Sequence, residues 1–137
     1  PNLTRFVNAI TMLEYCSREF DNVNALNKTI QKHQGYTPKN GADFVDRVSS
    51  LIEKINDVYQ LDLKDIEIIS KNIKDARIYY VHYDPSGKKL TDNQLFRYVY
   101  FIEDLIILNI YLIVGFNINK FGNISYNGCF YSIDNLK

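Results

Sequence analysis

Apolar side chains recur every three to four residues in four stretches of the chain, and polar segments separate these stretches. In the first stretch, Leu3, Phe6, Ile10 and Leu13 share one helical face. The pattern predicts a helix over about residues 3–20, a second after Asp43, a third from near Asp62 to before Asp84, and a fourth from Thr91 or Asp92 to Gly115. The predicted fold class is therefore all-α.

Local signals support the ends of these predicted helices. Asp43 is a favourable N-cap for the second helix, and Thr91 or Asp92 can cap the fourth. Pro85 disfavours helical backbone at the residue before it, so the third helix must end upstream of this point. Gly115 is a typical C-terminal stop for the fourth helix.

The fourth predicted helix is apolar over more than one face near its end. We therefore expect it to be central in the fold or to lie at a dimer interface. Residues 105–115 form the most apolar stretch, but they are too few to cross a bilayer and directly follow Glu103 and Asp104. No membrane association is expected.

The C-terminal tail has a different pattern. Residues 124–131 place Asn127-Gly128 between aromatic and β-branched side chains, which is a strong signal for a β-hairpin. A lone hairpin is marginal in water, so it must pack on the helices or on another chain. We therefore divide the sequence into a helical bundle, residues 1–116, and a C-terminal extension, residues 117–137, that carries the short hairpin.

Composition limits the classes of function. A chain of 137 residues fits one domain, and its 16 basic and 16 acidic residues balance, so RNA contact requires a local basic patch. Cys16 and Cys129 form no metal-ligand spacing with His33 or His82. Few cysteines and no signal peptide favour a reducing cytoplasm. The start at Pro1 fits a domain cut from a longer protein or simple removal of Met.

Residues 71–85 carry the chemistry. They place Arg77 and His82 five positions apart, with Lys71 and Lys74 upstream. RNA cleavage without a metal needs a group of near-neutral pKa to move protons at the 2′-hydroxyl or the leaving 5′-oxygen, and histidine meets this need. It also needs a fixed cation for the phosphate, which the arginine fork provides. Arg77 and His82 are therefore the candidate catalytic pair, with no metal and no cofactor.

The spacing of the pair adds a geometric constraint. Five residues along an α-helix turn through roughly 500°, so the two side chains would lie about 140° apart on a continuous helix. Either His82 lies on the unwinding end before Pro85, or two copies of the motif face each other across a two-fold dimer, and both can hold at once. The alternative is structural: Arg77 reaches solvent and His82 caps a helix C-terminus.

Other polar and aromatic residues have two interpretations each. Tyr79 and Tyr83 can stack on RNA bases, or they can pack in the core or at an interface. Lys71 and Lys74 can track the RNA backbone, or they can solvate an exposed helix face. Glu14 can pair with a basic group near the site, although an ordinary surface carboxylate is the simpler interpretation.

A family resemblance strengthens the catalytic interpretation. Residues 75–85, followed by a polar loop and a long apolar helix, resemble the HEPN superfamily, and more narrowly the HEPN domain of ApeA-type bacterial anti-phage proteins. Residues 5–15 are similar to the first helix of that group, and residues 43–48 stand where its second long helix would. The resemblance covers about residues 3–116.

This resemblance implies a bundle of four to five helices, usually dimeric through its motif-bearing helices. It also implies a metal-independent ribonuclease that cuts cellular RNA in anti-phage abortive infection or in a toxin system. Arg77 and His82 occupy the ends of the family motif, with Lys71, Lys74, Tyr79 and Tyr83 as candidate RNA contacts. In ApeA-type proteins the domain is the C-terminal part of a larger chain, so an N-terminal sensor region is an expected partner.

Two further functions stay open. One is a non-catalytic HEPN module that binds a partner or dimerises. The neutral net charge favours it, as does Ile78, because the family often has a polar residue at that position. In that case a polar substitution at Leu108 or Leu112 would matter more than one at His82. The other is a toxin that a cognate nucleotidyltransferase antitoxin silences.

Overall fold

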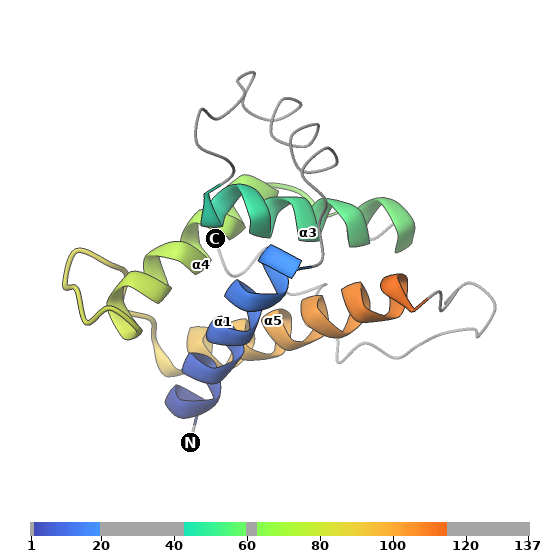
Figure 1. Cartoon of the computed structure of the whole chain (residues 1–137). Helices are drawn as coiled ribbons and strands as arrows, with labels where there is room; N and C mark the ends of the chain where they lie inside the picture. Colours follow the sequence, from blue (N-terminus) through green and yellow to red (C-terminus); the bar gives the residue numbers. More distant parts are fainter. Residues whose placement is uncertain (1, 20–42, 60–62, 115–137) are drawn as a thin grey trace.

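The computed structural model describes residues 2–19, 43–59 and 63–114, which form four α-helices (Figure 1). The helices are α1 (Asn2–Glu19), α3 (Phe44–Tyr59), α4 (Ile66–Tyr80) and α5 (Asp92–Ile113). The predicted all-α class is confirmed, and no strand occurs among the described residues. The expected hairpin at residues 124–131, Gly115 and the proposed boundary at 116/117 all lie outside these residues.

The four helices enclose one apolar core. Helix α1 packs mainly on α5, α3 packs mainly on α4, and α3 also contacts α1 and α5 (Figure 1). Fully buried side chains come from every helix: Phe6, Ile10, Leu13, Val48, Leu51, Ile52, Ile55, Ile69, Ile73, Ala76, Tyr98, Phe101, Ile102 and Leu105. The predicted apolar faces are thus confirmed, except that Leu3 is 48% exposed at the start of α1.

Two helix starts follow the predicted capping residues. The backbone N–H of Asp46 donates to the Asp43 carboxylate at 2.9 Å, and the Asp43 N–H donates to the Asp46 carboxylate at 3.2 Å. Thr91 and Gln94 form the same reciprocal capping box at the start of α5. Short sequence signals predicted these starts because the hydrogen bonds that make them are local.

The predicted start of α4 near Asp62 was wrong. The helix begins at Ile66, after Asp65, whose backbone is left-handed with φ 55°. The Asn56 side chain on α3 accepts a hydrogen bond from the Leu63 N–H at 2.8 Å and holds this residue in non-helical backbone. Leu63 is still buried, which explains why its apolar character suggested an earlier helical turn.

Helix α4 ends in a widened turn at the motif. The N–H groups of Val81 and His82 donate to the Arg77 carbonyl at 2.8 and 3.4 Å, and the Asp84 N–H donates to the Ile78 carbonyl at 3.2 Å. The helix therefore unwinds before Pro85, as predicted. Tyr83 completes the turn with a left-handed φ of 55°.

The loop that follows folds back along α4. The Lys88 N–H donates to the Asp75 carbonyl at 2.8 Å, and a Cβ at Gly87 would clash with the backbone of Asp75 and Tyr79. The Tyr80 hydroxyl accepts from the Leu90 N–H at 3.0 Å and donates to the Leu90 carbonyl at 3.2 Å. These bonds fix the loop beside the end of α4 that carries the motif.

The last turns of α5 expose apolar side chains. Ile107, Ile110, Ile113 and Val114 are each at least 40% exposed, whereas Leu108 is buried. None of the helices in the described part of the chain is long and apolar enough to pass through a membrane.

Candidate functional site

Arg77 is held at the junction of three helices. From α4, its Nε and Nη2 both donate to Oε2 of Glu14 on α1, at 3.1 and 2.7 Å. Its guanidinium carbon also lies 4.9 Å from the centre of the Phe44 ring on α3. The side chain is only 17% exposed, so the alternative in which Arg77 simply reaches solvent does not hold.

Glu14 joins two arginines at this junction. Its Oε1 accepts from Nη2 of Arg18 at 3.2 Å, while Oε2 accepts from Arg77. Its side chain is 26% exposed. Of the two interpretations that the sequence left open, pairing with a basic group near the motif is the one observed. The partners are 63 positions apart, so no local sequence pattern could identify the pair.

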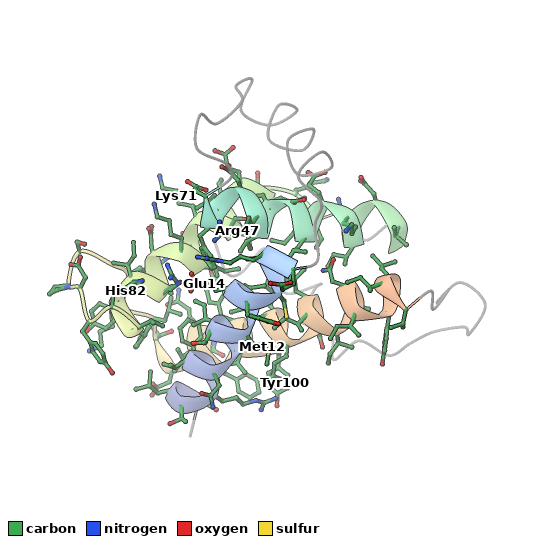
Figure 2. The ribbon with its side chains drawn as sticks, in the orientation of Figure 1. Met12, Glu14, Arg47, Lys71, His82 and Tyr100 are labelled. Carbon is green, nitrogen blue, oxygen red and sulfur yellow. The ribbon has the colours of Figure 1, made fainter. Side chains whose placement is uncertain are left out.

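Arg47 brings another guanidinium to the same region from α3, and sequence reasoning did not single it out (Figure 2). Burial, followed by repulsion from Arg18, lowers the pKa of Arg47 below its usual value, and Arg77 adds to this effect. Attraction to Glu14 and Asp43 offsets part of it. The electrostatic environment of Arg77 is therefore set by several charged side chains and not by one ion pair alone.

His82 has very different surroundings. It lies beyond the end of α4 and is exposed (Figure 2). Its backbone N–H donates to the Arg77 carbonyl, and its imidazole makes no hydrogen bond to any residue in the described ranges. The Asp84 carboxylate is close enough for attraction to His82 to contribute to lowering the pKa of Asp84, although hydrogen bonds from Ser86 are the larger causes.

The two motif residues are joined through backbone but not through side chains. Within the part of the chain that the structure describes, no hydrogen bond links the Arg77 guanidinium to the His82 imidazole. The widened turn at the end of α4 keeps both residues at one end of the same helix.

The remaining candidate RNA contacts lie along α4 and its loop. Lys71 is exposed and Lys74 half-buried on the helix surface. Tyr79 is half-buried and packs edge-on against Tyr80, with ring centres 4.9 Å apart. Tyr83 is 87% exposed. Tyr80 itself packs edge-on against Phe6 and is hydrogen-bonded to Leu90, so its ring is fixed in place.

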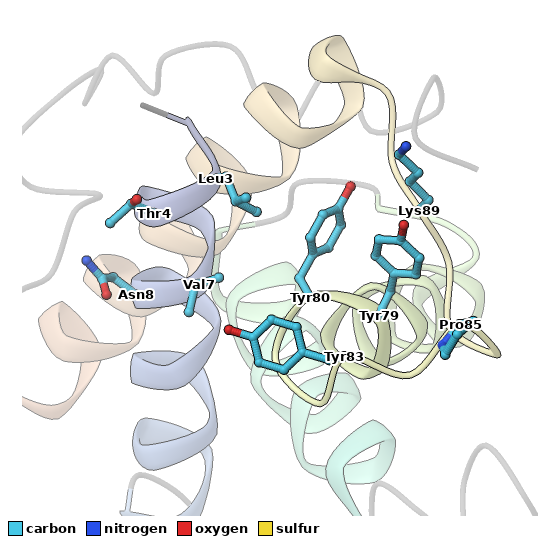
Figure 3. Close-up of a pocket in the computed structure, with 9 residues that line it drawn as sticks. All are labelled: Leu3, Thr4, Val7, Asn8, Tyr79, Tyr80, Tyr83, Pro85 and Lys89. Carbon is cyan, nitrogen blue, oxygen red and sulfur yellow. The ribbon is translucent and has the colours of Figure 1, made fainter.

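A pocket of about 630 Å³ opens between α1 and this end of α4 (Figure 3). Val7 and Asn8 line it from α1, and Tyr79, Tyr83 and Lys89 line it from α4 and the loop. In Figure 3 the Tyr83 ring extends toward Val7 across the pocket. The sequence predicted Tyr79 and Tyr83 as site residues but gave no sign that α1 would face them.

Residues 2–19, 43–59 and 63–114 contain no group of three or more His, Cys, Asp or Glu side chains placed to hold a metal ion.

Comparison with known families gives a match over most of the chain. The model of the family described as Apea-like HEPN matches residues 7–120, which is most of the chain. Neither the curated proteins nor the solved structures gave a match. The predicted resemblance to ApeA-type HEPN domains is confirmed by this family match.

Proposed function

Because the chain belongs to the Apea-like HEPN family, we propose that it is an endoribonuclease that cuts cellular RNA without a metal ion. Its activity serves anti-phage abortive infection or a toxin system in the cytoplasm. The observation that supports this best is that a fixed guanidinium and an exposed imidazole lie at the same end of α4.

Arg77 can still bind a phosphate while Glu14 holds its guanidinium in place. An arginine has five N–H donors, and Glu14 takes two of them in the described structure. The three others can bind the non-bridging oxygens of a phosphodiester and stabilise the charge that develops there. The ion pair with Glu14 and the contact with Phe44 hold the guanidinium in place before RNA arrives.

His82 acts as the proton-transfer group. Its imidazole accepts the proton of a ribose 2′-hydroxyl as that oxygen attacks the adjacent phosphorus. The bond from phosphorus to the 5′-oxygen breaks, and the leaving oxygen takes a proton from a second acid. The products are a 2′,3′-cyclic phosphate and a 5′-hydroxyl. Lys71 and Lys74 would bind neighbouring phosphates, and Tyr79 and Tyr83 would contact bases.

A homodimer through the motif-bearing helices supplies the second acid in this proposal. Two copies of α4 related by a two-fold axis would bring two imidazoles and two guanidiniums to one cleft. One His82 then accepts the proton of the 2′-hydroxyl, and the partner subunit's His82 protonates the leaving oxygen. An N-terminal sensor region or a cognate antitoxin would control this activity as a further partner.

The test is cleavage of a defined RNA by the purified protein in excess EDTA. We expect cleavage to continue with the chelator, products with 2′,3′-cyclic phosphate ends, and no cleavage where the attacking nucleotide is 2′-deoxy. Cleavage that stops in EDTA, or that proceeds equally at a 2′-deoxy position, would contradict the proposed mechanism.

The second candidate function is a non-catalytic HEPN module that dimerises or binds a partner. Exposed isoleucines on the last turns of α5 favour it. Leu108 is buried, so a polar substitution there would unfold the bundle rather than test an interface, and Ile107 and Ile110 are the better sites. In this case Ile110→Asp abolishes self-association or partner binding, and the wild-type protein does not cut RNA.

A further inference from the structure

The pocket between α1 and α4 combines aromatic surface with few polar groups. Tyr79, Tyr80 and Tyr83 contribute three rings at one end of α4, and Val7 faces them from α1 (Figure 3). A volume of about 630 Å³ lies in the range of sites that hold small ligands. The flat face of a nucleobase matches such a surface because aromatic rings stack on any base.

A charged group of the pocket matches the phosphate of a nucleotide. The Asn8 amide points away from the tyrosine rings (Figure 3), so the aromatic part of the pocket is left to the rings and to Val7. Lys89 is the one charged residue among those that line the pocket, and it carries the sign that attracts a phosphate. The Tyr80 hydroxyl is already bound to Leu90, which leaves its ring as the available contact.

The pocket lies beside the turn that carries His82, although His82 is not among the residues that line it. Tyr83, which lines the pocket, directly follows His82, and consecutive Cα atoms are only about 3.8 Å apart. The left-handed backbone of Tyr83, with φ 55°, carries its ring toward α1 at the end of the helix. A base that stacks on the Tyr83 ring would therefore lie one residue along the chain from His82, with its ribose near the turn that carries this histidine.

We propose that this pocket holds one unpaired nucleobase of the RNA, so that the ribose attached to it is presented to His82. The inference deepens the proposed function and rests on it for the cleavage step, but base binding can be measured separately. A paired base cannot enter, because its edge and faces are covered in an A-form duplex. The pocket thereby makes the protein select single-stranded positions.

The test measures RNA binding in a His82→Ala background, so that the RNA stays intact. The probes are a short single-stranded RNA with one 2-aminopurine and the same RNA annealed to its complement. We expect tighter binding of the single strand, with quenching of 2-aminopurine as the base stacks. Tyr83→Ala should weaken single-strand binding by about 5- to 150-fold and remove the quenching, while duplex binding stays unchanged.

A second variant and a matched control keep the test independent of folding. Val7→Trp fills the pocket from α1 and should give the same loss without touching Tyr83. Tyr15→Ala removes another exposed tyrosine, on α1, 62% exposed and outside the pocket, and should leave RNA binding unchanged. Circular dichroism of all three variants checks that the helices are intact.

Two outcomes would overturn the proposal: equal binding of single strand and duplex, or wild-type binding by both Tyr83→Ala and Val7→Trp. If His82-dependent cleavage persists in that case, the proposed function stands and the base pocket alone fails. If the binding differences appear but the wild-type protein cuts no RNA, the pocket stands and the catalytic proposal fails.

Discussion

The two ends of the five-residue motif have opposite surroundings. Arg77 is 17% exposed, bound twice by Glu14 and packed on Phe44, whereas His82 is exposed beyond the helix end. The fold has thus fixed the guanidinium before any RNA binds and has left the imidazole accessible to solvent and substrate. For the proposed chemistry this difference is useful, because the phosphate site must be rigid and the proton-transfer group must reach both RNA and water.

The contrast also separates catalytic from structural effects. A substitution at His82 removes chemistry with little change in packing. A substitution at Arg77 or Glu14 changes both, because it leaves a partly buried charge without its partner.

Substitution of His82 should have the largest effect on catalysis and the smallest on stability. We expect His82→Ala to lower the RNA cleavage rate by about 100- to 10,000-fold, because it removes the proton-transfer group. Its thermal midpoint should match that of the wild type, because exposed substitutions change stability by roughly 0.5 kcal/mol or less. His33→Ala, at the other histidine of the chain, is the control and should cut RNA normally. Equal cleavage by His82→Ala and wild type would exclude His82 from the chemistry.

Substitution of Arg77 should affect both properties. Arg77→Lys keeps the charge but cannot give two hydrogen bonds to Glu14 and still offer a fork to phosphate. We expect cleavage to fall by about 100-fold and the free energy of unfolding to fall by about 1 kcal/mol. Single-turnover kinetics and urea unfolding measure the two effects. A lysine variant with the wild-type rate would show that a charge alone is sufficient at this position.

Substitution of Glu14 tests whether it positions Arg77. Glu14→Gln should lower the cleavage rate by about tenfold, mainly in kcat, because the guanidinium is less firmly held. A purely structural role would lower stability without this change in kcat. Arg18→Ala is the matched control: Arg18 also binds Glu14, but its side chain is 63% exposed, so its loss should change little. Equal effects of the two substitutions would contradict the positioning role.

The smallest expected effect concerns the turn beside His82. The pKa of Asp84 is held below its ordinary value because its carboxylate accepts hydrogen bonds from Ser86. A lowered folded-state pKa means that the ionised carboxylate stabilises the turn above its unfolded pKa, and this contribution is lost as the pH falls through the folded value. The protection of the Ser86 and Gly87 amides against hydrogen exchange, relative to the intrinsic rate at each pH, should therefore fall in acid. Asp84→Asn should remove that pH dependence, and its persistence in the variant would assign it to another group.

Local patterns predicted the helices and their caps, because the capping hydrogen bonds of Asp43 and Thr91 are made with residues three positions further along the chain. The same kind of reasoning predicted the unwinding of α4 before Pro85. It failed at the start of α4, where the deciding contact comes from Asn56 on another helix.

The site was predictable only in part for the same reason. Arg77 and His82 were recognisable from their residue types and spacing. The partner Glu14, the nearby Arg47 and the α1 wall of the pocket depend on tertiary packing that brings distant segments together. A carboxylate on a predicted helix was the available signal for Glu14, and it did not indicate which cation would bind there.

The most direct test of the central claim is a double-mutant cycle on RNA cleavage, with Arg77→Ala, His82→Ala and the double variant under single-turnover conditions. If the two side chains act on one phosphodiester, the double variant should cut RNA no more slowly than the slower single variant, because groups that work as a unit are strongly non-additive. If the two losses multiply, the side chains act independently, and the joint site proposed for Arg77 and His82 does not exist.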